Sequence, residues 1–415
     1  MIELPGRVEY APLRGKKIIL GLTASSAIYR SIDLARRLIR LGAEIRVVMT
    51  REATSLIGEK LVEWAVGNPP IVEETGEAEH IGLAEWGDIL VIAPATLRTM
   101  SSIAAGILDQ TLFLTAATML GSGKKVIMVP TMNIRLLRSP QYRLVAEKLA
   151  EMGVYIMKPY IEEDKAKYPP LQDIIHCIQT HLHRGRDLEN IRILVTAGAT
   201  REYMDPIRFI SNPSTGYMGI ALAREAACRG AEVDLVAGHI EVEPPYYANL
   251  YRVETTGEMY RTISRLAREK EYHVAVFAAA PSDFKPLNRS SKKISSRITG
   301  GLVVRLQPTP KTIKALPKIR RPLLTIIFVA ETVQDHLELV EKARMKLREY
   351  RADLAVANNI TRTTGFASEY IDVCLVEAEK HTCMGTIRKE LLAQKIIDYI
   401  AEHLPPKTRR PDTVE

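Results

Sequence analysis

The sequence contains the same order of features twice, and this repeat constrains its fold most strongly. "GKKIILG" is an apolar run, followed by a serine-containing turn, an amphipathic stretch and a second run, "GAEIRVVM". "IRILVTAG" starts the same series again, which ends in "GAEVDLVAG". Each series then has a further apolar run, "DILVIAPAT" and "HVAVFAAAPSDF". Strands that alternate with helices favour an α/β class of fold with doubly wound, mostly parallel sheets, which bind ligands at the carboxyl ends of their strands.

The chain is long enough for two domains of this kind. At 415 residues it exceeds what one ordinary hydrophobic core supports. The polar stretch "HLHRGRDLEN" follows an amphipathic run and indicates the boundary. We therefore predict a first domain over 1–184, a linker over 185–190, a second domain over 191–404 and a flexible tail over 405–415.

Composition narrows the class of protein. Apolar runs such as "LLTIIFVA" are far shorter than the roughly 20 residues that span a bilayer, and no signal sequence is visible, so we expect a cytoplasmic protein without a membrane partner. The net charge of +8 comes from scattered basic residues without interleaved aromatics, which favours phosphorylated ligands over nucleic acid. Four cysteines without metal-ligand spacing predict reduced, buried thiols: Cys177, Cys228, Cys374 and Cys383.

Polar residues in the first half follow the predicted strands. Ser25 and Ser26 stand where a strand meets a helix, which suits either a phosphate or a plain helix N-cap. A second loop of small residues, "APATLRTMSS", follows the strand at 88–96. His80 and Asn133 are isolated, and each alone is typical of an ordinary histidine or a turn residue.

The second half has a polar connection of about twenty residues, "AGATREYMDPIRFISNPSTGYMG", where a βα unit needs only about 2–6. The following strand ends "LVAGH" without the acidic residue that usually holds the ribose in dinucleotide sites, which argues against NAD. Asp283 ends a strand and is suited to a metal or a nucleotide. Cationic candidates for a triphosphate are Lys285, Lys293, Lys311, Lys342 and Lys346, although the last two also fit a solvated helix face.

These motifs resemble a known family. Residues 15–400 are similar to the bifunctional coenzyme A biosynthesis proteins, phosphopantothenoylcysteine decarboxylase / phosphopantothenate–cysteine ligase. "TAGATREYMDPIRFISNPSTGYMG" resembles the ligase signature of the family. "AAAPSDF", Lys293-Ile294, "FVAET", "ADLAVANNI" and Gly365-Phe366 follow at the expected spacings. The resemblance implies a flavodoxin-like flavoprotein domain followed by a ligase domain.

For the second half the resemblance implies a ligase that joins 4′-phosphopantothenate to cysteine. CTP activates the carboxylate as an acyl-cytidylate, and Asn212 lies at the acyl-transfer centre. Magnesium is expected with the nucleotide, and Asp283 is its candidate ligand. The implied CTP contacts are Phe277, Ala278, Ala279, Asp283, Lys293, Thr309, Pro310, Lys311, Thr312, Ile313, Phe328, Lys342 and Lys346.

For the first half the resemblance implies an FMN-dependent decarboxylase of phosphopantothenoylcysteine. His80 matches the active-site histidine and Asn133 the residue that binds the substrate carboxylate. FMN would contact Ser25, Ser26, Thr50, Pro94, Ala95, Thr96 and Ser101. The segment aligned with the usual cysteine-containing flap, "YIEEDKAKYPPLQD", has no cysteine. Asp164, Lys165, Lys167, Tyr168 or a water could protonate the product instead, and none of them is assigned this role.

Three alternatives remain at this point. The missing cysteine is consistent with a ligase that keeps a degenerate flavoprotein domain. A non-catalytic flavin-binding regulatory protein and an NAD(P) oxidoreductase are the others. The resemblance also implies a homo-oligomer, with trimeric flavin domains and dimeric ligase domains.

Overall fold

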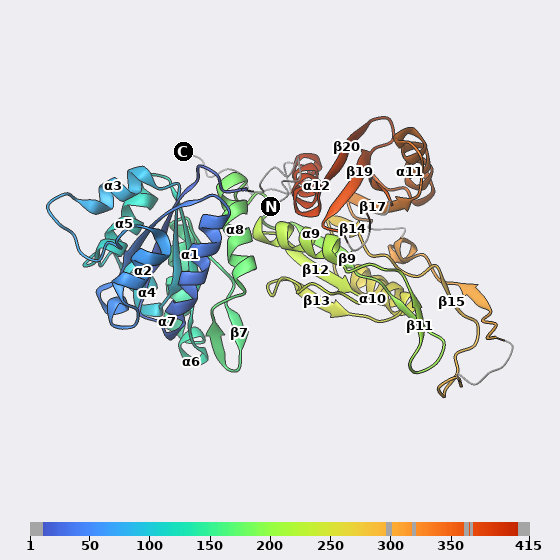
Figure 1. The fold of residues 1–415 in the computed structure, drawn as a ribbon, viewed down its shortest axis with the longest axis horizontal. Coiled ribbons are helices and arrows are strands. Elements are labelled where there is room, and N and C mark those ends of the chain that lie inside the picture. The colour runs from blue at the N-terminus through green and yellow to red at the C-terminus, as the bar shows by residue number, and fades with distance from the viewer. Residues whose placement is uncertain (1–10, 296–300, 318–320, 361–364, 366–367, 406–415) are drawn as a thin grey trace, which may run out of the picture. The chain divides into compact units, whose positions relative to one another are not determined.

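The computed structural model describes residues 11–295, 301–317, 321–360, 365 and 368–405. It consists of two compact units, Met1–Gly185 (the first unit) and Arg186–Glu415 (the second unit), shown in Figure 1. Most of the predicted tail and Phe366 lie outside the described residues. Among the described residues, none of the helices combines the length and the apolar character that crossing a membrane requires.

The first unit is built on a parallel sheet of five strands in the order β2-β1-β3-β4-β6. A small antiparallel sheet, β5-β8-β7, stands beside it. The strands are β1 (Lys17–Leu22), β2 (Glu44–Met49), β3 (Ile89–Ala95), β4 (Lys125–Pro130), β5 (Met132–Asn133), β6 (Val154–Ile156), β7 (Tyr160–Glu162) and β8 (Lys165–Lys167). The helices are α1 (Arg30–Arg40), α2 (Glu59–Val66), α3 (Glu79–Trp86), α4 (Leu97–Ala105), α5 (Thr111–Gly121), α6 (Ile134–Leu137), α7 (Pro140–Glu151) and α8 (Leu171–His183), with 3-10 turns η1 (Ser26–Tyr29) and η2 (Arg51–Ser55).

Apolar residues hold helices against this sheet. Ile19, Leu90 and Ile92 of the sheet pack with Leu83 of α3 and Leu112 of α5 in one buried cluster. The strands read as almost continuous apolar runs because helices cover both faces of a parallel sheet. The predicted doubly wound architecture is confirmed for this unit.

The second unit has an eight-stranded sheet in the order β13-β12-β9-β14-β17-β18-β19-β20. Neighbours are parallel from β13 to β18, and β19 and β20 are antiparallel to the strands beside them. The strands are β9 (Arg192–Ala197), β10 (Arg201–Tyr203), β11 (Phe209–Ser211), β12 (Glu232–Ala237), β13 (Asn249–Arg252), β14 (Val274–Phe277), β15 (Phe284–Pro286), β16 (Leu306–Pro308), β17 (Leu324–Glu331), β18 (Leu354–Asn359), β19 (Tyr370–Val376) and β20 (His381–Arg388). The helices are α9 (Tyr217–Cys228), α10 (Thr256–Glu269), α11 (His336–Tyr350) and α12 (Lys389–His403), with the 3-10 turn η3 (Thr312–Ala315).

Strand β9 shows how this sheet forms two cores. Ile193 and Val195 point to the face that α9 and α12 cover, and Leu194 points to the face that α10 and α11 cover. Successive residues of a strand face opposite sides, so an unbroken apolar strand supplies both cores. The prediction of a second doubly wound, mostly parallel sheet is confirmed.

The prediction of reduced thiols is wrong, because none of the four cysteines is free. Cys374 on β19 and Cys383 on β20 form a disulfide, with 3.9 Å between their Cα atoms. The two residues are only 9 positions apart, and the antiparallel pairing of the two strands places them opposite each other. Sequence spacing alone did not show this disulfide, because the bond depends on the register in which β19 and β20 pair.

Candidate active sites

A cavity of about 480 Å³ lies at the carboxyl ends of the central strands of the second unit. Residues at or just beyond the ends of β14, β17 and β18 line it, as expected for a doubly wound sheet. The structure brings together at this cavity most of the predicted ligase residues. These are Asn212, Phe277, Ala278, Ala279, Asp283, Thr309, Pro310, Lys311, Thr312, Ile313, Phe328 and Lys346.

The long connection between β9 and α9 contains a hairpin, which sequence reasoning treated as an irregular loop. Strands β10 and β11 pair in an antiparallel register, with Arg201 opposite Ser211. The carboxylate of Asp205 accepts hydrogen bonds from the N–H groups of Ile207 and Arg208, and from that of Ile294. These backbone hydrogen bonds, the one from Arg208 first, hold the pKa of Asp205 below its ordinary value. Asp205 thus anchors the hairpin to the segment that contains Lys293.

A buried polar network positions the loop after β14. The hydroxyls of Thr200 and Thr256 lie 2.7 Å apart, and the N–H of Ser282 donates to Thr200 at 2.9 Å. The carbonyl oxygen of Ser282 accepts from the hydroxyls of Thr256 and Thr309. Glu202 accepts from the N–H of Thr256 at 2.7 Å. Because unpaired buried polar groups are costly, this network fixes the backbone that leads to Asp283.

Asn212 is tied to the same loop. Its side-chain amide donates to the carbonyl oxygens of Ala280 at 3.2 Å and Pro281 at 3.0 Å. Both acceptors line the cavity, so the amide is held at the cavity wall.

The N-terminus of α9 faces the cavity, where Gly216, Tyr217 and Met218 line it. Gly216 is the N-cap and has a φ of 77°, which favours glycine. A Cβ on Gly219 would lie 2.6 Å from the carbonyl oxygen of Thr196, so glycine also allows the helix to pack closely on β9. Free N–H groups and the helix dipole at this end favour an anion.

The lysines predicted to hold a triphosphate differ in position. The Nζ of Lys311 lies 2.6 Å from Asp283, and that of Lys346 lies 2.8 Å from Glu349. Lys342 is outside the cavity lining and pairs with Glu338 at 3.0 Å and with Glu331, a cavity residue, at 3.3 Å. Lys293 is exposed and also lies outside the lining. Hydrogen bonds to carboxylates raise the pKa of Lys342 and Lys346, so both remain cationic.

Lys389 is a cavity residue that sequence reasoning missed. It is the first residue of α12, only 4% exposed, and its Nζ donates to the carbonyl oxygen of Gly365 at 2.9 Å. Burial disfavours the charged form and lowers its pKa to about 8. A lysine that begins an amphipathic helix gives no sign of burial in the sequence.

The first unit has its own cavity of about 360 Å³. Three of the predicted decarboxylase residues line it, namely Ser25, Ser26 and Asn133. Sequence reasoning did not select Arg30 or Thr131 for this cavity, and it named Lys165, Lys167 and Tyr168 only as possible proton donors. The hydroxyl of Thr131 lies 3.2 Å from that of Ser25, and this contact joins the ends of β4 and β1. Three cationic side chains around hydroxyl groups suit an anionic ligand.

The other predicted residues of this half lie outside the cavity lining, some at the ends of strands and some in helices. Thr50 follows β2 and is buried. Thr96 caps α4, which contains Ser101, and Pro94 and Ala95 end β3. The carbonyl oxygen of Pro94 accepts from the hydroxyl of Thr23, and that of Ala95 accepts from the N–H of Thr131. His80 lies in the first turn of α3, with its Nδ1 2.8 Å from Glu74.

The segment aligned with the flap is ordered as a hairpin. Strand β8 pairs with β7 on one side and with β5 on the other, which places Lys165 opposite Asn133. Tyr168 follows the hairpin and is 1% exposed, and its hydroxyl lies 3.4 Å from that of Ser31. Burial raises the pKa of Tyr168, so the phenol keeps its proton.

Comparison with known proteins covers almost the whole chain. Residues 188–404 match the family model described as DNA/pantothenate metabolism flavoprotein C-terminal domain, and residues 7–183 match the model described as Flavoprotein. The coenzyme A biosynthesis bifunctional protein CoaBC of Thermococcus kodakarensis is 39% identical, over 94% of this chain and 96% of its own. The protein of the same name from Methanocaldococcus jannaschii is 32% identical over 94% of each chain, and that from Escherichia coli is 31% identical over 96% and 100%. The chain therefore belongs to the family of coenzyme A biosynthesis bifunctional proteins.

Proposed function

We propose that the chain catalyses two consecutive steps of coenzyme A biosynthesis. The second unit ligates 4′-phosphopantothenate with cysteine at the expense of CTP, and the first unit decarboxylates the phosphopantothenoylcysteine formed. The observation that carries the proposal is the convergence of Asn212, Lys346 and the N-terminus of α9 on one cavity, in a chain of this family. A cytoplasmic location and a homo-oligomeric state fit the proposal.

In the ligase reaction the carboxylate attacks the α-phosphate of CTP and pyrophosphate leaves. The amine of cysteine then attacks the acyl carbon and CMP leaves. Negative charge grows on the phosphates in the first step, where Lys311, Lys346 and the N-terminus of α9 stabilise it. Asn212 orients the acyl group from a fixed position at the cavity wall.

Two cavity carboxylates fit a magnesium ion that accompanies the nucleotide. Asp283 and Glu331 line the cavity, and magnesium is usually held by one or two carboxylates together with substrate phosphates. Phosphate oxygens would supply the remaining ligands. The ion would neutralise charge on the leaving pyrophosphate.

Lys389 gives the same cavity a proton acceptor. With a pKa of about 8, about a tenth of its amine is neutral at pH 7. It can therefore take a proton from the ammonium group of cysteine before that amine attacks. Lys389→Met should lower the rate of ligation, because it removes this proton acceptor. Lys389→Arg should lower that rate as well, because an arginine at this position would stay charged.

The first cavity fits the phosphate of FMN. Ser25, Ser26 and Arg30 line it with Lys165 and Lys167, and this set of hydroxyls and cations suits a phosphomonoester. Bound FMN would supply the redox chemistry that makes loss of the carboxylate possible. Asn133 can hold the substrate carboxylate.

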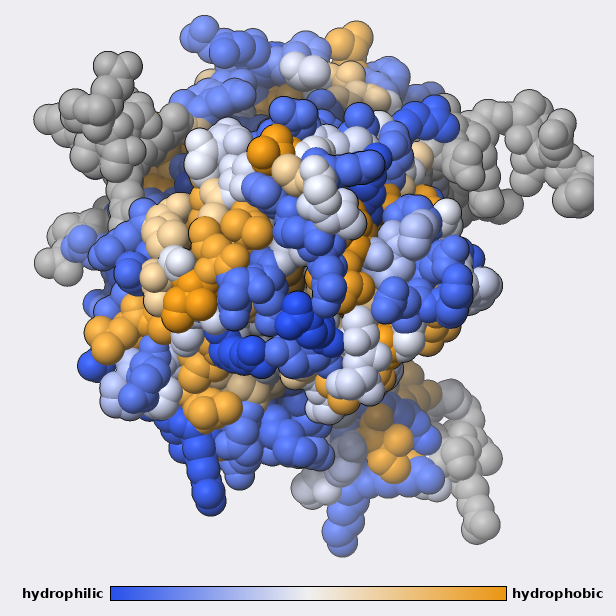
Figure 2. Space-filling model, turned by 90° about the vertical axis from the view of Figure 1, so that its left-hand side faces the viewer, coloured by the Kyte–Doolittle hydropathy of each residue, from blue (hydrophilic) through white to orange (hydrophobic). Residues whose placement is uncertain are grey.

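Apolar side chains on the surface of the first unit fit contacts between copies of the flavin domain. Figure 2 shows apolar patches between polar side chains on this face of the molecule. Tyr29 of the cavity lining is 66% exposed, and Trp64 is also 66% exposed. Patches of this kind often mark protein contacts.

Two assays on the purified protein test the proposal. Pyrophosphate should be released from CTP only when 4′-phosphopantothenate is present, and its absence under those conditions would refute the ligase. Yellow protein that releases CO₂ from phosphopantothenoylcysteine supports the decarboxylase. Pyrophosphate without CO₂ would instead support the ligase-only alternative.

A further inference from the structure

Two cysteines and a histidine meet on the second unit, apart from the residues that line its cavity. Cys374 and Cys383 are directly paired across β19 and β20. The register shifts between Val373 and Cys374, so the hairpin is irregular at this point. Such irregularities re-aim side chains, and here both sulfur atoms lie on the side of the hairpin that faces His336.

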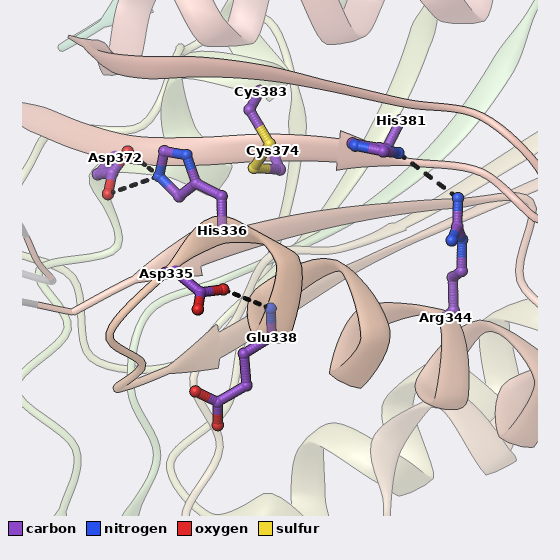
Figure 3. Close-up of a disulfide and its surroundings, with 8 residues drawn as sticks. All are labelled: Asp335, His336, Glu338, Arg344, Asp372, Cys374, His381 and Cys383. Atoms are coloured by element: carbon purple, nitrogen blue, oxygen red, sulfur yellow. Dashed lines mark hydrogen bonds and ion pairs between the residues drawn. A yellow bond between two sulfur atoms is a disulfide. The ribbon is translucent and has the colours of Figure 1, made fainter.

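His336 is held in place by two neighbours. It is the first residue of α11, whose N-cap, Asp335, accepts a hydrogen bond from the N–H of Glu338 at 2.9 Å. Its Nε2 lies 3.0 and 3.1 Å from the two carboxylate oxygens of Asp372 on β19 (Figure 3). Nδ1 is then the ring nitrogen available to a further ligand, since the carboxylate occupies Nε2.

The three side chains have the chemistry of a metal site. Ligand atoms of His336, Cys374 and Cys383 all lie within 4.8 Å of one another, and no other such group of His, Cys, Asp or Glu is found in the part of the chain that the structure describes. Two thiolates and an imidazole suit zinc. Asp372 supplies the carboxylate that metal-bound histidines usually contact through their other nitrogen.

We propose that Cys374, Cys383 and His336 bind Zn²⁺ when the disulfide is reduced. A phosphine or dithiol reductant supplies two electrons, the S–S bond breaks, and each sulfur takes up one proton. Zinc binding then releases both protons as the thiols become thiolates. The disulfide and the metal complex exclude each other, so the site binds zinc only in its reduced state.

Metal titration of the full-length protein tests this proposal. Protein reduced with a phosphine is titrated with Zn²⁺ against a chromophoric chelator, and with Co²⁺ while its absorption spectrum is recorded. We expect reduced protein to bind one more zinc ion per chain than untreated protein, and its cobalt complex to show thiolate-to-metal charge-transfer absorption. Equal zinc binding before and after reduction, or a cobalt spectrum without that absorption, would overturn the proposal.

Variants locate the ion. The double variant Cys374→Ser/Cys383→Ser should lose the additional zinc ion, and Asp372→Asn should bind it about 10–100-fold more weakly. His381→Ala is the matched control, since His381 lies on β20 but outside the cluster, and its affinity should equal that of the wild type. Equal affinity in the double variant would contradict the proposal. If that variant does not fold, alkylation of the reduced wild type with iodoacetamide should abolish binding in its place.

Discussion

At the scale of single residues, the side-chain amide of Asn212 connects two loops. It donates to the carbonyl oxygens of Ala280 and Pro281, which lie 68 and 69 positions away in the sequence. The motif predicted that Asn212 takes part in the acyl transfer. It did not indicate that the side chain also ties the hairpin connection to the loop after β14. Such a role depends on which backbone carbonyls the fold brings near, and local sequence does not contain that information.

Asn212→Asp should lower the rate of pyrophosphate release by about 100-fold or more, as loss of an oriented donor does in other active sites. A carboxylate cannot donate to the two carbonyl oxygens and repels them. Asn68→Asp is the control, because Asn68 also donates to two backbone carbonyls but lies in the first unit. Equal rates for the two variants would contradict a role for Asn212 in the ligase site.

Lys389 predicts a pH dependence of stability. Its pKa is about 8 in the folded protein and about 10.5 when exposed, so unfolding takes up a proton between these values. Stability should therefore gain a contribution that rises with pH across this window. The melting temperature of Lys389→Met, measured by scanning fluorimetry from pH 7.5 to 10, should lack this rise relative to the wild type. Parallel curves for the two proteins would contradict the shifted pKa.

At the scale of secondary-structure elements, sequence patterns were sufficient for the central strands and their covering helices. Apolar runs and helical periodicity repeat in both units. They were insufficient for β10 and β11, which are three residues each and show no alternation. The buried Asp205 organises this hairpin through a hydrogen bond from Ile294, which lies 89 positions away. The hairpin therefore depends on a tertiary contact and not on its local sequence.

Gly219→Ala should destabilise the second unit and slow the ligase. The added Cβ would meet the backbone of β9 and displace the N-terminus of α9 from the cavity, at a cost of about 1–3 kcal/mol. Thermal unfolding and pyrophosphate release measure both effects. Gly257→Ala in α10 is the control, since its Cβ would meet only ordinary contacts of 3.5 Å or more. A Gly219→Ala protein as stable and active as this control would contradict the packing argument.

At the scale of the whole molecule, the division of the chain into two α/β units was predictable because each unit repeats the same pattern. More of the residues predicted for the ligase line the cavity of the second unit than residues predicted for the decarboxylase line the cavity of the first unit. The motifs at the strand ends of the second unit lie together around one cavity. His80 and Thr50, in contrast, lie outside the lining of the first cavity. Lys165 and Lys167 reach that cavity only because β8 pairs with β5, a contact that the sequence did not show.

Separate cavities predict that the two activities can be separated. Asn133→Ala should abolish CO₂ release and leave pyrophosphate release unchanged. Asn212→Asp should lower pyrophosphate release by about 100-fold or more and leave CO₂ release unchanged. A mixture of the two variants should convert 4′-phosphopantothenate, cysteine and CTP to 4′-phosphopantetheine, provided that the intermediate diffuses between molecules. Mass spectrometry of the product checks this. No product from the mixture, with each remaining activity intact, would indicate that the intermediate does not leave the protein.

The pairing of β8 with both β5 and β7 has a kinetic consequence. The backbone of β8 cannot move away from the first cavity unless its pairing with Met132 and Asn133 breaks, so we predict that this three-stranded ladder acts as a latch. Hydrogen–deuterium exchange over residues 132–133 and 160–167 would then report how often the latch opens. If departure of the product limits turnover, that opening rate sets the pace of the decarboxylase.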